Sequence, residues 1–212
     1  MPRQNQRDER AYWDGVASLG GTATQCAIWG EPGAWASRVP ACLEAIVPAI
    51  AEVFVSGARV VDLGCGIGRL AIPIARQFPG IRVIGVDISR VMLDAAAVEA
   101  AAAGLRNVDW RLGDGRTLPP RLDTLDAAYS MILFQHIPRE AAASYIRQLA
   151  RHLRPGGRIR FQYVEGTESE LMSYHATEPT MRAACETNGL DVVAVDRGLI
   201  YPGWTWITAR KP

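Results

Sequence analysis

Two kinds of periodicity divide the chain near Gly57. From Arg59 on, short apolar runs alternate with stretches in which apolar positions recur at helical spacing. The apolar runs predict strands at residues 59–63, 82–87, 108–112, 125–131 and 158–164. The helical spacing predicts helices at residues 69–78, 90–103 and 139–153. Strands that alternate with helices in this way predict a parallel sheet whose crossovers are right-handed.

The last part of the chain departs from this order. A helix at 179–188 is followed by strands at 191–196 and 204–209, with a Tyr201-Pro202-Gly203 turn between them. So short a connection makes an antiparallel hairpin. We therefore expect an α/β fold with a doubly wound, mostly parallel seven-stranded sheet and one antiparallel strand near its edge.

The first 57 residues lack this regular alternation. Helical patterns at 4–18 and 34–55 flank a loop-like stretch at 20–33, and Pro40 and Pro48 should interrupt or bend the second helix. We expect residues 1–57 to form an N-terminal helical cap and residues 58–212 to form the main domain. Four aromatic residues of the cap could close over a ligand or cover apolar surface of the domain: Tyr12, Trp13, Trp29 and Trp35.

Composition narrows the class of protein. The chain of 212 residues is 49% hydrophobic and 21% charged, as expected for a packed globular protein, and its net charge of +1 creates no strong field for nucleic acid or an anionic membrane. No apolar run is long enough to span a membrane, and the first ten residues are polar. Four widely spaced cysteines form no C-x-x-C pair. We therefore expect a cytoplasmic protein without a metal site.

A glycine-rich turn follows the first strand of the main domain. Residues 62–68 read Asp-Leu-Gly-Cys-Gly-Ile-Gly, and a helical pattern begins directly after them. Glycines permit positive φ and let a ligand approach the bare backbone, and the first N–H groups of the helix lack intrahelical acceptors. The arrangement is typical of a turn that binds a nucleotide-like cofactor.

An acidic residue stands where such a cofactor would need it. Asp87 ends the second strand, 23 residues after Gly64, and a carboxylate there can accept both hydroxyls of a ribose. Ser89 can cap the helix that follows.

Five motifs in this part of the chain resemble those of the class I methyltransferases, which use S-adenosylmethionine. VVDLGCGIGRLA at 60–71 resembles the first motif of that family, and VIGVDIS at 83–89 resembles its acidic second-strand motif. LGDG at 112–115 matches the family's acidic loop after the third strand. LDAAYS at 125–130 matches its fourth strand, and LRPGG at 153–157 matches its L-x-P-G-G turn. The resemblance covers about residues 59–212 and implies that residues 58–212 form an S-adenosylmethionine-binding methyltransferase domain.

The resemblance also implies which residues bind the cofactor. By position these are Asp62, Gly64, Cys65, Gly66, Gly68, Asp87, Ile88, Met92, Asp114, Gly115 and Met131. In the family the acid at the place of Asp114 contacts the adenine amino group, although an acid there can also cap its own loop. Asp62 can contact the ligand, order the turn, or do both.

Methyl transfer is an in-line displacement at a sulfonium carbon, so the enzyme must chiefly align the acceptor and exclude water. In similar small-molecule methyltransferases a histidine often stands at the place of His136, after the fourth strand, where it serves as base or orienting group; a structural histidine is the alternative.

His152 is expected to be structural, at a helix end. A loop after the fifth strand could contact substrate through Tyr163, Glu165, Tyr174 and His175.

The same residues bear on other functions. A nicotinamide-dependent dehydrogenase shares the strand, turn and acid but not the LGCGIG and LRPGG spelling. The fourth strand is not followed by an N/D-P-P-Y motif or a Pro-Cys pair, which disfavours a nucleic-acid methylase. We therefore expect a small-molecule acceptor. A nucleic-acid or protein methyltransferase and a non-catalytic cofactor-binding partner subunit are the alternatives, and the sequence assigns no oligomeric state.

Overall fold

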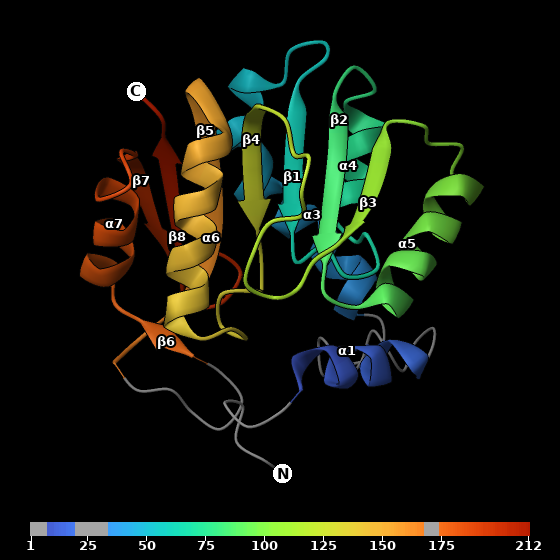
Figure 1. Ribbon diagram of the computed structural model, residues 1–212, viewed down its shortest axis with the longest axis horizontal. Helices are drawn as coiled ribbons and strands as arrows, with labels where there is room; N and C mark the ends of the chain where they lie inside the picture. The colour runs from blue at the N-terminus through green and yellow to red at the C-terminus, as the bar shows by residue number, and fades with distance from the viewer. Residues whose placement is uncertain (1–7, 20–33, 168–173) are drawn as a thin grey trace.

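Figure 1 shows a computed structural model of the chain, which describes residues 8–19, 34–167 and 174–212. Its centre is one sheet in the order β3-β2-β1-β4-β5-β8-β7, and β6 pairs with β5 beside this path. The strands are β1 (Arg59–Leu63), β2 (Arg82–Asp87), β3 (Val108–Leu112), β4 (Leu125–Ser130), β5 (Leu153–Glu165), β6 (His175–Ala176), β7 (Asp191–Arg197) and β8 (Trp204–Arg210).

The predicted fold class is confirmed. The strands β1 to β5 pair in parallel, and β8 runs antiparallel to both β5 and β7. The strand β6 is an eighth strand that the sequence did not predict, because its two residues are too few to show any period.

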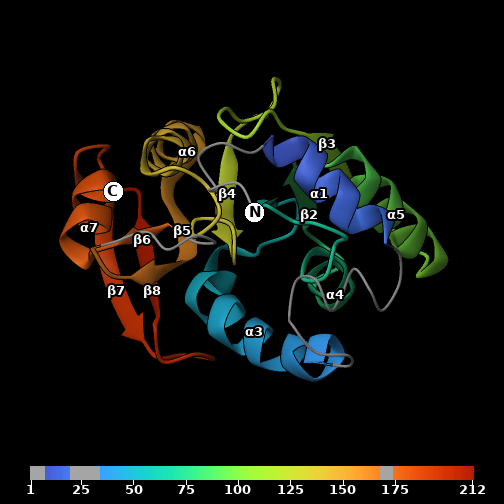
Figure 2. The same cartoon turned by 90° about the horizontal axis from the view of Figure 1, so that it is seen from below.

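Helices cover both faces of the sheet. They are α1 (Glu9–Ser18), α3 (Ala34–Ile50), α4 (Ala71–Gln77), α5 (Arg90–Ala102), α6 (Arg139–His152) and α7 (Glu178–Glu186), with one 3-10 turn, η2 (Ala51–Val53). Neighbouring strand residues point to opposite faces, so Val61 packs with α6 and α7 while Val60 packs with α3 and α4. Figure 2 shows α6 on one side of the sheet and α3 and α4 on the other. None of the helices in the described ranges is long and apolar enough to cross a membrane.

The helix α3 differs from the prediction. It runs through Pro40 and continues past Pro48 before η2 begins. Of the two expected outcomes, interruption or bending, the interruption is therefore wrong, and the bend stays a prediction. Tertiary contacts compensate for the prolines: Cys42, Ile46 and Ile50 are fully buried on the sheet, and arginines of β5 donate to the carbonyls of α3. The helix α3 is therefore a layer of the core, although it belongs to the segment expected to be a cap.

The L-x-P-G-G segment also differs from the expected turn. Residues 153–157 form the irregular start of β5, with a register shift against β4. Gly156 adopts a φ of +77° and donates its N–H to the carbonyl of Lys211 at 2.8 Å. The end of the chain therefore draws this segment into the sheet, which sequence neighbours alone do not indicate.

The helix α1 is placed differently from the others. The arrows of β1, β2 and β4 point to the lower edge of the molecule in Figure 1, and α1 lies beyond this carboxyl edge. Seen from below, α1 lies beside α5 (Figure 2), with which it is in contact. The carboxyl edge of an open α/β sheet is where ligands bind, so α1 covers the region in which a site is expected.

Candidate functional site

A cavity of about 770 Å3 lies at the carboxyl edge of the sheet. Its walls come from the turn after β1, the end of β2, the loop after β3, the segment after β4, and from α1, α5 and α6. Ten of the twelve predicted site residues line it: Gly64, Cys65, Gly66, Asp87, Ile88, Met92, Asp114, Gly115, Met131 and His136. One cavity therefore collects residues from motifs more than 70 positions apart in the chain.

The glycine turn is fixed by the neighbouring strand. Gly64 donates its N–H to the carbonyl of Val86 at 2.8 Å, and Gly66 donates to the Asp87 carboxylate at 2.7 Å. Both glycines have positive φ, and a Cβ on Gly64 would come within 2.9 Å of the Leu133 Cβ. Glycine is required at this point because the turn packs directly against the segment that follows β4.

Asp87 is the acidic group at the centre of the site. Besides Gly66, its carboxylate accepts the N–H of Ser89 at 2.9 Å. Burial raises the pKa of Asp87, and the carboxylate of Asp14 adds to this, while the backbone N–H groups oppose it. The hydroxyl of Ser89 accepts from the Met92 N–H and caps α5, which confirms the predicted cap.

Two predicted residues, Asp62 and Gly68, lie outside the cavity lining. Asp62 is only 3% exposed, and burial raises its pKa to about 7 against the opposing effects of the Tyr129 hydroxyl and the Arg69 guanidinium. A Cβ on Gly68 would lie 2.8 Å from the ring of Trp110. Asp62 is buried beside Tyr129 and Arg69, and Gly68 packs against Trp110, and the sequence motif does not distinguish such packing from ligand contact.

Asp114 lines the cavity with an exposed carboxylate that also orders its own loop. It accepts the N–H groups of Arg116 and Thr117 at 2.8 and 2.6 Å, and the hydroxyl of Thr117 at 2.5 Å. Asp114 therefore caps its own loop, which is one of the two roles that the sequence left open. Its contact with the adenine amino group stays a prediction.

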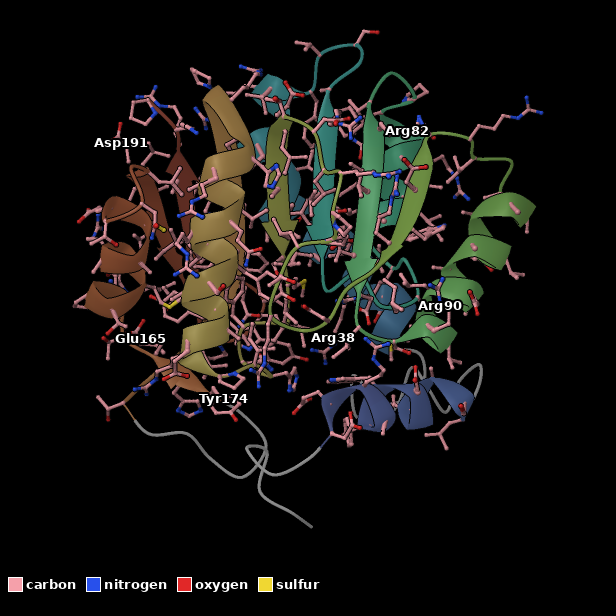
Figure 3. All side chains as sticks on the ribbon, in the orientation of Figure 1. Arg38, Arg82, Arg90, Glu165, Tyr174 and Asp191 are labelled. Atoms are coloured by element: carbon pink, nitrogen blue, oxygen red, sulfur yellow. The ribbon has the colours of Figure 1, made fainter. Side chains whose placement is uncertain are left out.

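The segment after β4 brings His136 to the cavity. The half-buried imidazole faces the ring of Trp13 edge-on, with centroids 5.3 Å apart. Tyr174 lines the same cavity, and its N–H donates to the Gln135 carbonyl at 2.7 Å. Figure 3 places Tyr174 at the lower edge of the molecule, toward α1.

The other three residues of the expected substrate loop lie elsewhere. Tyr163 is buried in the core beneath α6 and α7, Glu165 is exposed and accepts the N–H of Glu178, and His175 belongs to β6. None of them lines the cavity. Tyr163 lies within the strand predicted at 158–164, and β5 runs one residue further to include Glu165, so both belong to the sheet and not to a loop.

The helix α1 is attached to the cavity by polar contacts at two points. Arg10 donates to the Gly113 carbonyl at 3.0 Å, and the Ser89 hydroxyl donates to Asp14 at 2.5 Å. Between these points Trp13 covers His136. Of the other candidate aromatics, Tyr12 does not line the cavity, Trp29 lies outside the described residues, and nothing is described of the Trp35 side chain.

Sequence reasoning missed Arg69 as a site residue. It stands just before α4, lines the cavity, and donates toward the sulfur atoms of Cys42 and Met131 at 3.8 and 3.9 Å. A cation is unfavourable at a helix N-terminus, so an arginine directly after the last glycine was the available signal. Burial lowers its pKa, and the nearby Asp62 opposes this.

The thiol of Cys65 is not activated as a nucleophile. Burial raises the pKa of Cys65 well above its ordinary value, and Asp87 and Asp62 add to the effect, so the thiol stays protonated. No cluster of histidine, cysteine or acidic side chains able to hold a metal occurs within the described ranges.

Comparison with known proteins agrees with the resemblance found in the sequence. Residues 60–157, just under half of the chain, match the model of a methyltransferase domain. Nocamycin O-methyltransferase of Saccharothrix syringae is 42% identical over 107 residues, covering 49% of this chain and 36% of that protein. Trans-aconitate 2-methyltransferase of Azoarcus sp. (strain BH72) is 34% identical over 132 residues, covering 62% of this chain and 46% of that protein. The chain thus spans less than half the length of these two curated relatives.

Among solved structures, magnesium protoporphyrin IX methyltransferase from Synechocystis PCC 6803, crystallised with S-adenosylmethionine, has the same fold. The TM-score is 0.72 at 19% identity, covering 97% of this chain and 98% of that one. At this identity the likeness shows the fold, and it extends over α1 and α3 as well as the matched domain.

The buried Asp62 predicts an unusual pH dependence of stability. Because its folded pKa is about 7 and its unfolded pKa is near 3.8, the native state holds more protons than the unfolded state in this window. The free energy of unfolding should therefore fall as pH rises, by up to about 4 kcal/mol between about pH 4 and pH 8. Asp62→Asn should remove this fall, as measured by urea unfolding at several pH values.

Asp94→Asn is the control, because the side chain of Asp94 is 68% exposed. This control should keep the pH dependence of the wild type. A parallel pH profile for wild type and Asp62→Asn would show that Asp62 is ionised throughout and would contradict the raised pKa.

Proposed function

Because the chain carries the methyltransferase domain of the class I, S-adenosylmethionine-dependent enzymes at residues 60–157, we propose that it transfers a methyl group to a small-molecule acceptor. One observation carries this proposal: a single cavity joins the glycine turn and Asp87 to His136 and Trp13. A donor and an acceptor must share one enclosed space for an in-line displacement.

The residues of the first half of the cavity fit S-adenosylmethionine. The volume of about 770 Å3 is within the usual range for cofactor sites, and a Cβ at Gly66 would add bulk where the turn faces Met92. The Asp87 carboxylate would accept hydrogen bonds from the ribose hydroxyls. The guanidinium of Arg69 would pair with the carboxylate of the cofactor's methionine part. Apolar side chains of Ile88 and Met92 would flank the adenine, with Asp114 near its amino group.

S-adenosylmethionine, when bound, supplies an electrophilic methyl group on a sulfonium. The chain's own residues then have two tasks. The walls formed by Trp13, Ile137 and Tyr174 exclude water and orient the acceptor, which lowers the barrier chiefly through alignment. His136, which lines the same cavity, accepts the proton of a hydroxyl or phenol acceptor as a general base.

A small-molecule acceptor is proposed from the lining of the cavity and the net charge of the chain. The two curated relatives are named after small molecules, and Trp13 of α1 lines the cavity together with the sheet's loops, which suits a small molecule better than a duplex. A net charge of +1 gives little attraction to nucleic acid. Three described cysteines are buried free thiols, which supports the proposal that the reaction takes place in the cytoplasm.

Asp87→Ala tests the cofactor half. Loss of charge-assisted hydrogen bonds to the ribose, each worth about 1.5 to 3 kcal/mol, should weaken binding of S-adenosylhomocysteine by more than about tenfold. Titration calorimetry measures this, with Asp94→Ala as a surface control. Unaltered affinity in Asp87→Ala, or no heat with the wild type, would exclude the proposed cofactor site.

His136→Ala tests the acceptor half. We expect tritium from labelled S-adenosylmethionine to appear in at least one member of a panel of phenols, carboxylic acids and hydroxylated amines. With that acceptor, His136→Ala should lower kcat by about a hundredfold or more while leaving affinity for S-adenosylhomocysteine nearly unchanged. His152→Ala is the matched control at a helix end. A loss of only a few-fold would show that alignment suffices and that His136 is not the base.

We further propose that the segment 1–57 acts as a cap through α1, since Arg10 and Asp14 tie α1 to both sides of the cofactor half. Asp14→Ala removes the contact with Ser89 and should speed dissociation of S-adenosylhomocysteine several-fold in stopped-flow measurements. Glu99→Ala, at an exposed position on α5, is the control. An unchanged dissociation rate in Asp14→Ala would mean that α1 only packs on the domain.

A further inference from the structure

A buried glutamine of β5, which the proposed reaction does not use, lies beneath the segment that carries His136. Gln162 is fully buried, and it stands one residue beyond Phe161, the last partner of β4 in the parallel ladder. From this point β4 leaves the sheet, so the backbone groups that follow Ser130 lose their strand partner. Buried backbone groups need another one.

The side-chain amide of Gln162 bonds both ends of a short segment, through the backbone of Ile132 and the side chain of Gln135. Its Oε1 accepts the N–H of Ile132 at 2.9 Å, and its Nε2 donates to the Oε1 of Gln135 at 3.1 Å. One side chain thus spans residues 132–135, directly before His136. Inside a protein such a bond is costly to lose, because the groups left behind stay buried without water.

Ile132 is held in a conformation that a β-branched residue rarely adopts. Its φ is +65°, in the left-handed region that favours glycine. Such strain persists only where surrounding contacts impose it. The hydrogen bond from Ile132 to Gln162 is a contact of this kind, made at the strained residue itself.

The direction of the chain after Ile132 determines where His136 lies. Leu133 then packs against Gly64 of the glycine turn, and the N–H of His136 donates to the Leu133 carbonyl at 2.7 Å. If Ile132 relaxed to negative φ, the path of residues 133–136 would change and the imidazole would leave its place beside Trp13.

We propose that Gln162 is a positioning residue of the acceptor half: its amide keeps Ile132 in the left-handed conformation and so aims His136 into the cavity. The inference deepens the proposed function and rests on it for the role of His136. The described hydrogen bonds of the Gln162 side chain run to Ile132 and Gln135, whereas the glycine turn is held by Val86 and Asp87, so we expect the cofactor half to keep its arrangement.

The test uses the full-length protein with histidines labelled in the imidazole. The chain has three histidines, and His136 lies against the ring of Trp13, whose ring current shifts its NMR signal. Gln162→Met, of similar size, should displace the His136 signal toward the value of an imidazole without that ring, while His152 and His175 keep theirs. This readout needs no acceptor and no activity.

A second substitution distinguishes the loss of positioning by Gln162 from general damage to the fold. Adding Ile132→Gly to Gln162→Met should return the His136 signal toward that of the wild type, because glycine adopts positive φ without strain. Gln148→Met is the matched control: Gln148 makes the same kind of bond, to the N–H of Leu118 at 2.9 Å, away from His136. It should leave the His136 signal in place.

Once an acceptor is identified, kcat can be measured as well. Gln162→Met should lower kcat by about tenfold to a hundredfold, because His136 is misplaced. The affinity for S-adenosylhomocysteine should stay within about twofold of wild type. A His136 signal that does not move in Gln162→Met, or that moves and is not returned by Ile132→Gly, overturns the proposal. If Gln162→Met does not fold, Gln162→Asn, too short to reach Ile132, replaces it and the same outcomes decide. Absence of any methyl transfer would instead contradict the proposed function and leave the NMR result to judge Gln162.

Discussion

The carboxylate of Asp87 is the group on which the rest of the site depends. It is half-buried at the end of β2 and accepts the N–H groups of Gly66 and Ser89. Through Gly66 it sets the glycine turn, and through Ser89 it is linked to the cap of α5 and to Asp14 on α1. A charge taken out of water must be compensated by such donors, so three elements are arranged around one residue.

The second half of the site is built on different bonds. The segment after β4 is held by Gln162 from β5 and contacts the first half where Leu133 meets Gly64. The two halves thus touch but are not set by the same interaction. Such a division lets the acceptor half change among related proteins while the glycine turn and Asp87 keep their arrangement, in line with a fold that serves many acceptors.

Local sequence signals predicted the parts of the structure that local interactions determine. The apolar runs placed the main strands, and the glycine turn with Asp87 placed the cavity at the carboxyl edge. Contacts between distant residues decided the rest. The helix α3 tolerates Pro40 because arginines of β5 and the sheet hold it, and the L-x-P-G-G segment joins β5 because Gly156 meets Lys211. Arg69 lines the cavity next to Cys42 of α3 and Met131 after β4, both far from it in the chain.

A crystal structure of the protein with S-adenosylhomocysteine tests the central claim most directly, namely that one cavity holds the cofactor at Asp87 and presents its sulfur to the His136 side. We predict ribose hydroxyls within hydrogen-bond distance of the Asp87 carboxylate, about 2.5 to 3.0 Å. The sulfur should face open space bounded by His136 and Trp13. A ribose away from Asp87, or protein atoms filling the space between the sulfur and His136, would contradict the account.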